Sequence, residues 1–147
     1  MLVDSHCHLD RIDLAPDAGD FAGLLAATRA SGVGHSLCVS IDLQAYPAML
    51  ALVEPYAEVS VSVGVHPNER DTAEPDPEAL VDLARHPKNV AIGETGLDYF
   101  HGKGDLEWQR ERFRRHVAAA RRARKPLIIH SRDARRDTLA ILREEGA

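Results

Sequence analysis

Two histidines separated by one residue are the first residues of the chain whose types and spacing suit chemistry. His6 and His8 follow the apolar start Met1–Val3. In an extended strand alternate side chains share a face, so both imidazoles are expected to point the same way and can hold one metal ion. Cys7 lies between them on the opposite face and is not expected to be a ligand. A polar turn after a strand fits the same pattern, so this motif alone leaves both interpretations open.

Three later apolar segments also end in polar side chains. Their sequences are G-V-H-P, A-I-G-E-T-G-L-D-Y and I-I-H-S-R-D-A, and the polar residues they carry include His66, Glu94, Asp98, Tyr99, His130 and Arg132. A carboxylate buried after an apolar strand, as expected for Glu94, needs a partner because an unpaired buried charge is costly. One metal ion, or a bridge between two, would supply that partner. Imidazole and carboxylate ligands suit Zn, Mn, Ni or Fe, and Mg with more water, and the sequence does not choose among these metals.

Strand and helix patterns alternate along the whole chain. Alternating or continuous apolar runs predict strands, and apolar positions three and four residues apart predict helices. The expected strands are Leu2–His8, His35–Ile41, Val59–Val65, Asn89–Glu94 and Leu127–His130. The expected helices are Asp20–Ala30, Leu43–Tyr56, Glu78–Arg85, Asp105–Arg124 and Asp133–Glu145, with long loops at His66–Pro77 and Leu97–Gly104. No linker or repeat interrupts this pattern, so residues 1–147 are expected to form a single domain.

Repeated strand–helix units predict a sheet of parallel strands with helices packed outside it. Two α/β architectures fit, a doubly wound open sheet and a TIM-type (βα)8 barrel. A doubly wound dinucleotide-binding sheet is expected to have a glycine-rich turn after its first strand, where this chain has His-x-His-x-Asp. Polar clusters past the ends of successive strands are typical of the barrel. We therefore expect a TIM (βα)8 barrel, of which the chain supplies about five βα units.

In order and spacing, the motifs H-C-H-L-D, G-V-H-P, G-E-T-G-L-D-Y and I-I-H-S-R-D-A resemble those of the TatD-type metal-dependent deoxyribonucleases of the amidohydrolase superfamily. The resemblance runs from Leu2 to the end of the chain, and four motifs in order make it specific. It implies a TIM barrel with two divalent metal ions and hydrolysis of the phosphodiester bonds of DNA. Two metal ions close together activate water and hold both the attacking and the leaving oxygen.

The resemblance also implies roles for metal ligands. His6 and His8 would hold one metal ion. Glu94 would bridge the two ions as the catalytic carboxylate, and His130 would help to hold the second ion. The resemblance covers the N-terminal portion of the family's barrel, so these are the ligands that this portion contributes.

Substrate contacts follow from the same resemblance. His66 and Arg132 would face the scissile phosphate or the nucleic-acid backbone, and a guanidinium offers a fork that matches phosphate oxygens. Asp98 and Tyr99 would lie at the rim of the pocket. His66 precedes Pro67 and is also consistent with a residue that only shapes the loop.

Other polar residues are expected to be structural. Asp4 and Asp10 would orient the ligand histidines, as carboxylates near metal sites do. His35 and His116 would belong to the packing of a strand and a helix, and His101 to a solvated loop. The basic residues of the longest helix would form its outer face, paired with Glu107 and Glu111; they are Arg110, Arg112, Arg114, Arg115, Arg121, Arg122, Arg124 and Lys125.

The chain departs from the family in length. A (βα)8 barrel takes about 250 residues, and this chain has 147. By the resemblance, a later histidine of the second metal site and a later aspartate of the first lie beyond Ala147. The second metal would then keep only Glu94 and His130, so we expect impaired activity if the chain ends there. Unpaired strand edges recruit other chains, and we therefore also expect self-association.

Composition is that of an ordinary globular domain, with 44% hydrophobic and 28% charged residues and a net charge of −5. This charge gives no general sign of a nucleic-acid partner or an anionic membrane, so a role on DNA rests on the site. No apolar run reaches the about 18 residues that span a bilayer, and no signal-peptide pattern opens the chain. Cys7 and Cys38 are expected to stay reduced, and the expected compartment is the cytoplasm.

Two other functions stay open at this point. A related enzyme of the amidohydrolase superfamily would act on a small amide, lactone or phosphoester. A non-catalytic half-barrel would bind metal or a partner chain without turnover. A substrate screen distinguishes the first from a nuclease, and metal binding without hydrolysis would indicate the second.

Overall fold

The computed structural model describes residues 1–14 and 20–147, and within them the chain forms five strands and five α-helices. The strands are β1 (Leu2–Cys7), β2 (Val33–Cys38), β3 (Val59–Val63), β4 (Asn89–Asp98) and β5 (Leu127–Arg132). The helices are α1 (Phe21–Ala30), α2 (Tyr46–Val53), α3 (Pro77–Ala84), α4 (Glu107–Ala123) and α5 (Arg135–Glu144). A short 3-10 helix, η1 (Leu9–Arg11), follows β1. The order of strands and helices is the predicted one.

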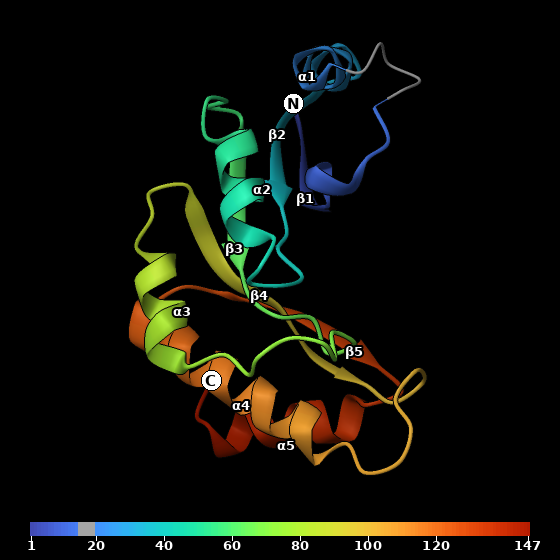
Figure 1. Cartoon of the computed structure of the whole chain (residues 1–147), viewed down its shortest axis with the longest axis vertical. Helices are drawn as coiled ribbons and strands as arrows, with labels where there is room; N and C mark the ends of the chain where they lie inside the picture. The colour runs from blue at the N-terminus through green and yellow to red at the C-terminus, as the bar shows by residue number, and fades with distance from the viewer. Residues whose placement is uncertain (15–19) are drawn as a thin grey trace.

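The five described strands form one parallel sheet in chain order, β1-β2-β3-β4-β5. The sheet curls, so that β1 and β5 lie far apart and their directions differ strongly (Figure 1). Helix α4 packs against β4 and lies beside α3 and α5. A doubly wound sheet reverses its strand order at a switch point, and no reversal occurs in these strands. The arrangement confirms the predicted class: five consecutive units of a TIM-type barrel.

Strands β4 and β5 extend further than the sequence predicted. β4 continues beyond Glu94 to Asp98, and β5 continues beyond His130 to Arg132. The added residues pair in register, Gly96 with His130 and Asp98 with Arg132. Asp98 was expected in a loop, and the structure instead places it at the end of β4, beside Arg132 of β5.

Two glycines allow β4 to lie this close to β5. Gly93 and Gly96 have φ angles of 135° and 137°, which side chains rarely permit. A Cβ added at Gly93 would lie 2.5 Å from the carbonyl oxygen of Ile128, and one at Gly96 would overlap the carbonyl of His130. The G-E-T-G sequence therefore brings the backbone that carries Glu94 alongside the next strand.

Helix α4 fixes the sheet through one buried stripe. The positions predicted to face inward are all buried; they are Leu106, Gln109, Phe113, Val117 and Ala120. A larger apolar cluster contains Val59, Val61 and Val63 of β3, and a smaller one around Phe113 and Ile141 joins α4 to α5. Burial of these side chains stabilises β3 and β4, two of the strands whose ends carry polar clusters.

The outer strands of the described sheet are less well covered. Val3 of β1 is 57% exposed and Ile129 of β5 is 38% exposed. Strands β3 and β4 between them are mostly buried. No helix in the described part of the chain is long and apolar enough to cross a membrane.

Candidate metal centre

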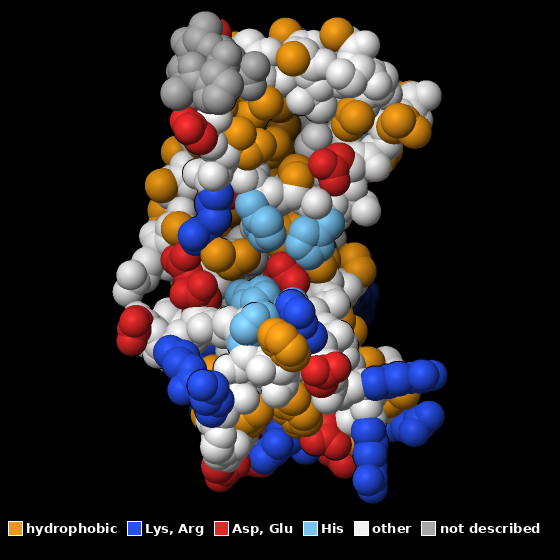
Figure 2. Space-filling model, turned by 90° about the vertical axis from the view of Figure 1, so that its right-hand side faces the viewer, with side chains coloured by type: hydrophobic (Ala, Val, Ile, Leu, Met, Phe, Trp, Pro, Cys, Tyr) orange, Lys and Arg blue, Asp and Glu red, His pale blue; other side chains and the backbone are white. Residues whose placement is uncertain are grey.

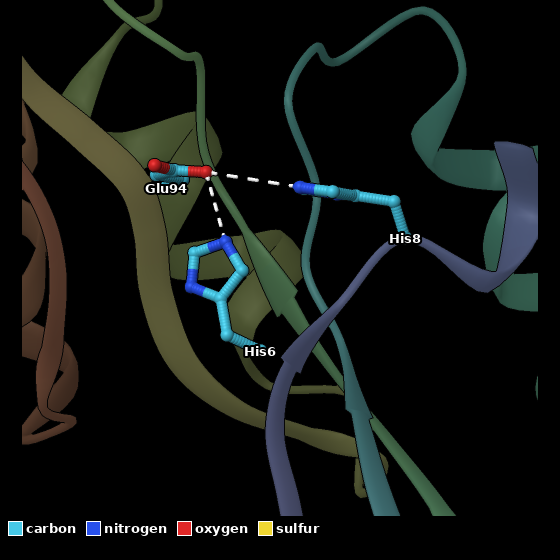
Figure 3. A group of neighbouring side chains, drawn as sticks. All are labelled: His6, His8 and Glu94. Atoms are coloured by element: carbon cyan, nitrogen blue, oxygen red, sulfur yellow. Dashed lines mark hydrogen bonds and ion pairs between the residues drawn. The ribbon is translucent and has the colours of Figure 1, made fainter.

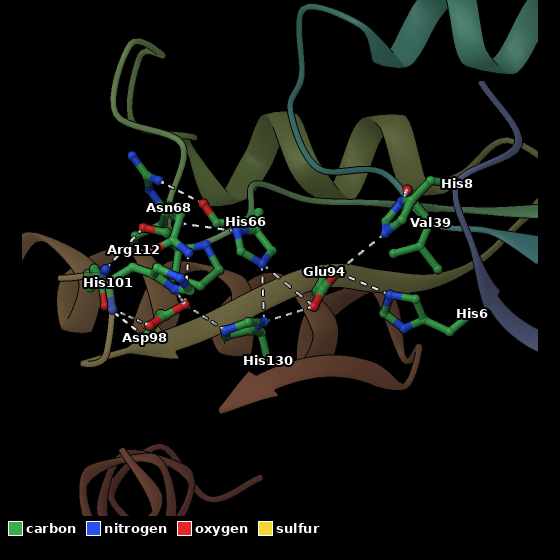
Figure 4. Close-up of polar contacts among 12 residues, drawn as sticks. His6, His8, Val39, His66, Asn68, Glu94, Asp98, His101, Arg112 and His130 are labelled. Atoms are coloured by element: carbon green, nitrogen blue, oxygen red, sulfur yellow. Dashed lines mark hydrogen bonds and ion pairs between the residues drawn. The ribbon is translucent and has the colours of Figure 1, made fainter. Parts of the chain in front are cut away.

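The carboxylate of Glu94 lies between two pairs of histidines. Its side chain is only 10% exposed. Oε2 lies 3.1 Å from Nε2 of His6 and 4.0 Å from Nε2 of His8 (Figure 3). Oε1 lies 3.1 Å from Nδ1 of His130 and 3.7 Å from Nε2 of His66 (Figure 4). Each oxygen of one buried carboxylate thus faces a different pair of imidazoles.

These side chains come from four of the five described strands or from the loops that follow them. His6 is in β1 and His8 just after it, His66 follows β3, Glu94 is in β4 and His130 in β5. The carboxyl ends of parallel barrel strands meet at one face, which explains the convergence of residues distant in sequence. In the space-filling view, the histidines gather in the middle of one face with acidic side chains beside them (Figure 2).

Two groups of side chains in the described residues have ligand atoms within 4.8 Å of one another and could each hold a metal ion. The first is His6, His8 and Glu94, and the second is His66, Glu94 and His130. Glu94 belongs to both. The four residues predicted to be metal ligands are therefore brought together, and Glu94 is common to both groups.

The ring of His8 is fixed by a backbone carbonyl. Nδ1 of His8 lies 2.8 Å from the carbonyl oxygen of Val39, directly after β2. A carbonyl only accepts, so Nδ1 carries the proton and donates it. In the neutral ring, Nε2 then carries a lone pair, and this is the atom that faces Glu94.

The ring of His130 is fixed in the same way by a buried carboxylate. Nε2 of His130 lies 3.1 Å from Oδ2 of Asp98, so Nε2–H donates and Nδ1 carries the lone pair toward Glu94. Asp98 also accepts hydrogen bonds from the backbone N–H of His101 at 2.9 Å and from the amide of Asn68 at 2.8 Å. Burial raises the pKa of Asp98, but the hydrogen bonds from His101, Asn68 and His130 outweigh burial and hold this pKa well below its ordinary value. Asp98 is thus an ionised carboxylate that orients His130.

This pattern of hydrogen bonds fits a cation beside Glu94. In these tautomers, His8 directs a lone pair toward Oε2 of Glu94 and His130 directs one toward Oε1. Two acceptors that face one another need a proton or a metal ion between them, and at His130 an N–H of His66 also points to the lone pair. Nitrogen and carboxylate oxygen are ligands that divalent transition metals prefer. The donor set around Glu94 therefore suits metal binding.

His66 differs from His8 and His130. The backbone N–H of Asn68 donates to Nδ1 of His66 at 3.1 Å, so the proton of the neutral ring is on Nε2. Nε2–H points at Nδ1 of His130, 3.1 Å away. Burial, together with the neighbouring His130, outweighs the attraction of Glu94 and lowers the pKa of His66 to about 4. In this tautomer His66 donates a hydrogen bond and has no lone pair left for a metal.

Three buried polar side chains of α4 hold the backbone around His66. Nε2 of His116 accepts a hydrogen bond from the N–H of Val65 at 3.0 Å. The guanidinium of Arg112 donates to the carbonyl of His66 at 3.1 Å. The amide of Gln109 donates to the carbonyl of Pro67 at 3.1 Å. Positions three and four apart on a helix share one face, so a single face of α4 fixes this segment.

Arg112 corrects one prediction about α4. The sequence placed it with the outer basic face, and the structure buries it, with Nε bonded to Oε2 of Glu74 at 3.0 Å and a second bond to the same carboxylate. Arg110 and Arg115 do pair with Glu107 and Glu111, as predicted. Arginine spacing alone could not separate Arg112 from its neighbours because the acid that neutralises it is distant in sequence.

The residues predicted to contact substrate lie in different environments in the structure. Asp98 was expected at the rim and is fully buried beneath His130. The hydroxyl of Tyr99 bonds to Asp137 at 2.7 Å and so points to α5. Arg132 is exposed, and its guanidinium lies over the ring of Phe100. His66 adjoins the predicted ligands Glu94 and His130.

Other residues near the histidines have different partners from those predicted. Asp4 accepts the backbone N–H of His6, and Asp10 contacts Cys38, so no described contact joins either carboxylate to a ligand ring. Burial first, and then the charge of Asp4, raise the pKa of Cys7 to about 12. Cys7 donates to the carbonyl of Leu37, which confirms that it faces away from the ligands. His116 is buried within the packing of α4, as predicted.

Comparison with known proteins gives a consistent result. A family model described as "TatD related DNase" matches residues 3–147. The chain is 46% identical over 145 residues to the "uncharacterized metal-dependent hydrolase YcfH" of Escherichia coli K12, covering 98% of this chain and 54% of YcfH. It is 35% identical over 148 residues to the "uncharacterized metal-dependent hydrolase YabD" of Bacillus subtilis, covering 100% of this chain and 57% of YabD. The chain thus spans about half the length of the curated relatives it matches.

A solved structure shares the fold. The crystal structure of YJJV, a TatD homolog from Escherichia coli K12, superimposes with a TM-score of 0.85 at 27% sequence identity. The match covers 97% of this chain and 55% of that one. The curled sheet described above therefore corresponds to roughly half of a larger solved fold.

Proposed function

The chain belongs to the TatD family, and from this premise we propose that the centre around Glu94 binds two divalent metal ions and hydrolyses phosphodiester bonds of DNA. The chain spans about half the length of its relatives, so we propose this activity for the protein in which these residues form the centre. One observation carries it: each oxygen of the Glu94 carboxylate faces its own pair of histidines.

The residues suited to hold metal divide into two sets. His6, His8 and Glu94 would hold the first ion. Glu94 and His130 would hold the second, since the lone pair of His130 faces the carboxylate while that of His66 does not. Bound divalent ions supply Lewis acidity, which lowers the pKa of water and offsets the charge of a phosphate.

The chain's own donors would bind and orient the phosphate. His66 presents Nε2–H beside the ligands and is held there by Asn68 and by α4. With a metal ion on the lone pair of His130 that this N–H faces, it would donate to a phosphate oxygen instead. Arg132 is exposed on the same strand as His130 and would bind the nucleic-acid backbone through its N–H groups. Asp98 would keep His130 in its tautomer throughout.

Two considerations support DNA as the substrate. The matching family model is described as a DNase. The donors beside the ligands, an imidazole N–H and a guanidinium, are groups that bind phosphate oxygens. The compartment we propose is the cytoplasm, on the cysteine usage given above.

The test is divalent-metal-dependent release of nucleotides from single-stranded DNA. Glu94→Gln is isosteric and removes the bridging charge, so we expect activity to fall by about a hundredfold or more and calorimetry to show weaker metal binding. Glu111→Gln is the matched control, since Glu111 is an exposed carboxylate paired with Arg115 on the outside of α4. Equal activity of Glu94→Gln and the wild type would contradict the proposal. So would rapid turnover of a small amide or phosphoester together with none on DNA.

A further inference from the structure

An exposed aromatic ring lies two residues beyond Asp98, the carboxylate that orients His130. Phe100 is 58% exposed, and the guanidinium carbon of Arg132 lies 4.2 Å from the centroid of its ring. The ring of His101 contacts Phe100 edge to face, with centroids 4.8 Å apart. Among the described residues, no carboxylate forms an ion pair with Arg132. The pair therefore presents a flat, cationic and accessible surface, and we name Phe100 and Arg132 the stacking platform.

The stacking platform is fixed close to the proposed metal ligands. Arg132 and His130 are two residues apart in β5, so they share a face at a separation of about 6–7 Å along the strand. On the other strand, Asp98 accepts hydrogen bonds from both the backbone N–H and Nδ1 of His101, each at 2.9 Å. The same carboxylate orients His130. The turn that carries Phe100 is thus attached to the residue that orients a metal ligand.

A ring stacked on a guanidinium next to a phosphodiester-cleaving centre suits a nucleobase. Unpaired bases stack on aromatic rings and on arginine planes, whereas bases within a duplex have their faces covered. When its face covers Phe100, the guanidinium still has N–H groups at its edge for a phosphate. One pair of side chains can therefore contact both parts of a nucleotide.

We propose that Phe100 and Arg132 bind an unpaired nucleobase of the nucleotide next to the bond that is cleaved. This inference rests on the proposed function and deepens it, because it specifies how a base, and not only a phosphate, is recognised. A small amide or phosphoester without a base would have no use for the stacking platform.

Binding of fluorescently labelled, single-stranded oligonucleotides tests the inference without requiring turnover. Phosphorothioate linkages slow hydrolysis, and an abasic residue is placed at each position in turn. Binding is measured by anisotropy with divalent metal and again with a chelator. The variants are Phe100→Leu, which removes the ring face, Phe100→Tyr, which keeps it, and Arg132→Lys, which keeps only the charge. Arg115→Lys is the control, an exposed arginine of α4 that pairs with Glu111.

We expect one abasic position to weaken wild-type binding about tenfold, within the range measured for stacking of one base. Phe100→Leu should bind intact and abasic strands equally, Arg132→Lys should reduce the difference, and Phe100→Tyr and Arg115→Lys should retain it. Competition by thymidine monophosphate that depends on Phe100 would show that a free nucleotide suffices. Absence of that competition would show that the base must belong to a strand.

The inference is overturned if no abasic position distinguishes the wild type from Phe100→Leu. Nucleotide release that remains sensitive to Glu94→Gln would in that case leave the proposed function intact. If the wild type neither binds the strands nor releases nucleotides with any metal, both the inference and the proposed function fail.

Discussion

Backbone groups and one buried carboxylate determine which ring nitrogen carries the proton in three histidines of this centre. The carbonyl of Val39 accepts Nδ1–H of His8, and the carboxylate of Asp98 accepts Nε2–H of His130. In His66, by contrast, the N–H of Asn68 donates to Nδ1, so the ring proton is on Nε2. Three imidazoles in one cluster therefore differ in function through their partners: two present lone pairs and one presents a proton. This difference supports the proposed division into metal ligands and a phosphate donor more sharply than distance alone does.

Replacing Asp98 tests this assignment. Asp98→Asn keeps the size of the side chain but removes the charge that holds His130 Nε2–H, so the tautomer with its lone pair on Nδ1 is no longer favoured. We expect metal affinity to fall about 10- to 100-fold, measured by calorimetric titration. Asp82→Asn, an exposed carboxylate of α3 paired with Arg85, is the control. Unchanged affinity in a folded Asp98→Asn variant would contradict the orienting role.

His116 makes stability depend on pH. Burial lowers the pKa of His116 to about 4 from an ordinary 6.5, and its Nε2 must stay unprotonated to accept from Val65. His116 therefore binds a proton more tightly in the unfolded chain than in the folded one. Its contribution to the free energy of unfolding is complete above pH 6.5 and is lost as pH falls from 6.5 toward 4, at up to about 1.4 kcal/mol per pH unit. Urea unfolding at neutral and mildly acidic pH measures it.

The variant His116→Gln isolates that contribution. Glutamine retains an acceptor for Val65 but does not titrate, so the loss of stability between neutral pH and pH 5 should shrink by about 2 kcal/mol relative to the wild type. The same acid dependence in both proteins would assign the effect to other groups. Asp98 contributes with the same sign at lower pH, because a depressed carboxylate pKa also stabilises the fold until acid protonates it.

At the residue scale, sequence reasoning found the side chains that could bind metal but not the groups that orient them. His6, His8, Glu94 and His130 carry their chemistry in their residue types. A carbonyl such as that of Val39, or an N–H such as that of Asn68, has no signal in the sequence because every residue has one. The role of Asp98 was missed for a related reason: the strand was predicted to end at Glu94, which put Asp98 in a loop.

The elements that position the site are β4 and α4. β4 passes close to β5 because two glycines leave room for its backbone, and α4 then fixes the loop after β3 through three buried polar side chains. Periodicity predicted both elements and the inner stripe of α4. It could not predict that Arg112 would also turn inward, since its partner Glu74 is distant in sequence, or that His116 would bond to the backbone of Val65 in another unit.

Gly96→Ala tests the close approach of β4 to β5. A methyl group there would overlap the carbonyl of His130 in addition to straining the backbone, so we expect a loss of about 2–3 kcal/mol in unfolding free energy. Gly32→Ala is a matched control, because Gly32 has a φ of 90° but nothing within 4 Å of an added Cβ. It should cost only the conformational strain, about 1 kcal/mol. Chemical denaturation of both variants measures the difference, and equal losses would mean that strain, not contact with β5, requires glycine.

At the scale of the whole molecule, the five described units form one side of a barrel. The order and direction of the strands were predicted correctly because each strand–helix unit is local and its parallel pairing follows from the repeat. The curl of the sheet and the alignment of the site across β1, β3, β4 and β5 follow from that topology rather than from any single motif. The centre is accordingly a property of the assembled units, and its histidines approach Glu94 from separate strands and loops (Figure 4).

The outer strands give the last prediction. The 147-residue chain by itself presents β1 and β5 as the outer strands of its described sheet, with Val3 and Ile129 exposed. Unpaired parallel edges bearing apolar side chains recruit further strands, so we expect the isolated chain to self-associate as its concentration rises. Sedimentation velocity over a range of concentrations measures this. Val3→Lys and Ile129→Lys place charge on the two edges and should shift the distribution toward monomer, whereas Leu139→Lys, an exposed position on α5, should not. A well-folded wild-type monomer at every concentration would show that the edges are protected without a partner.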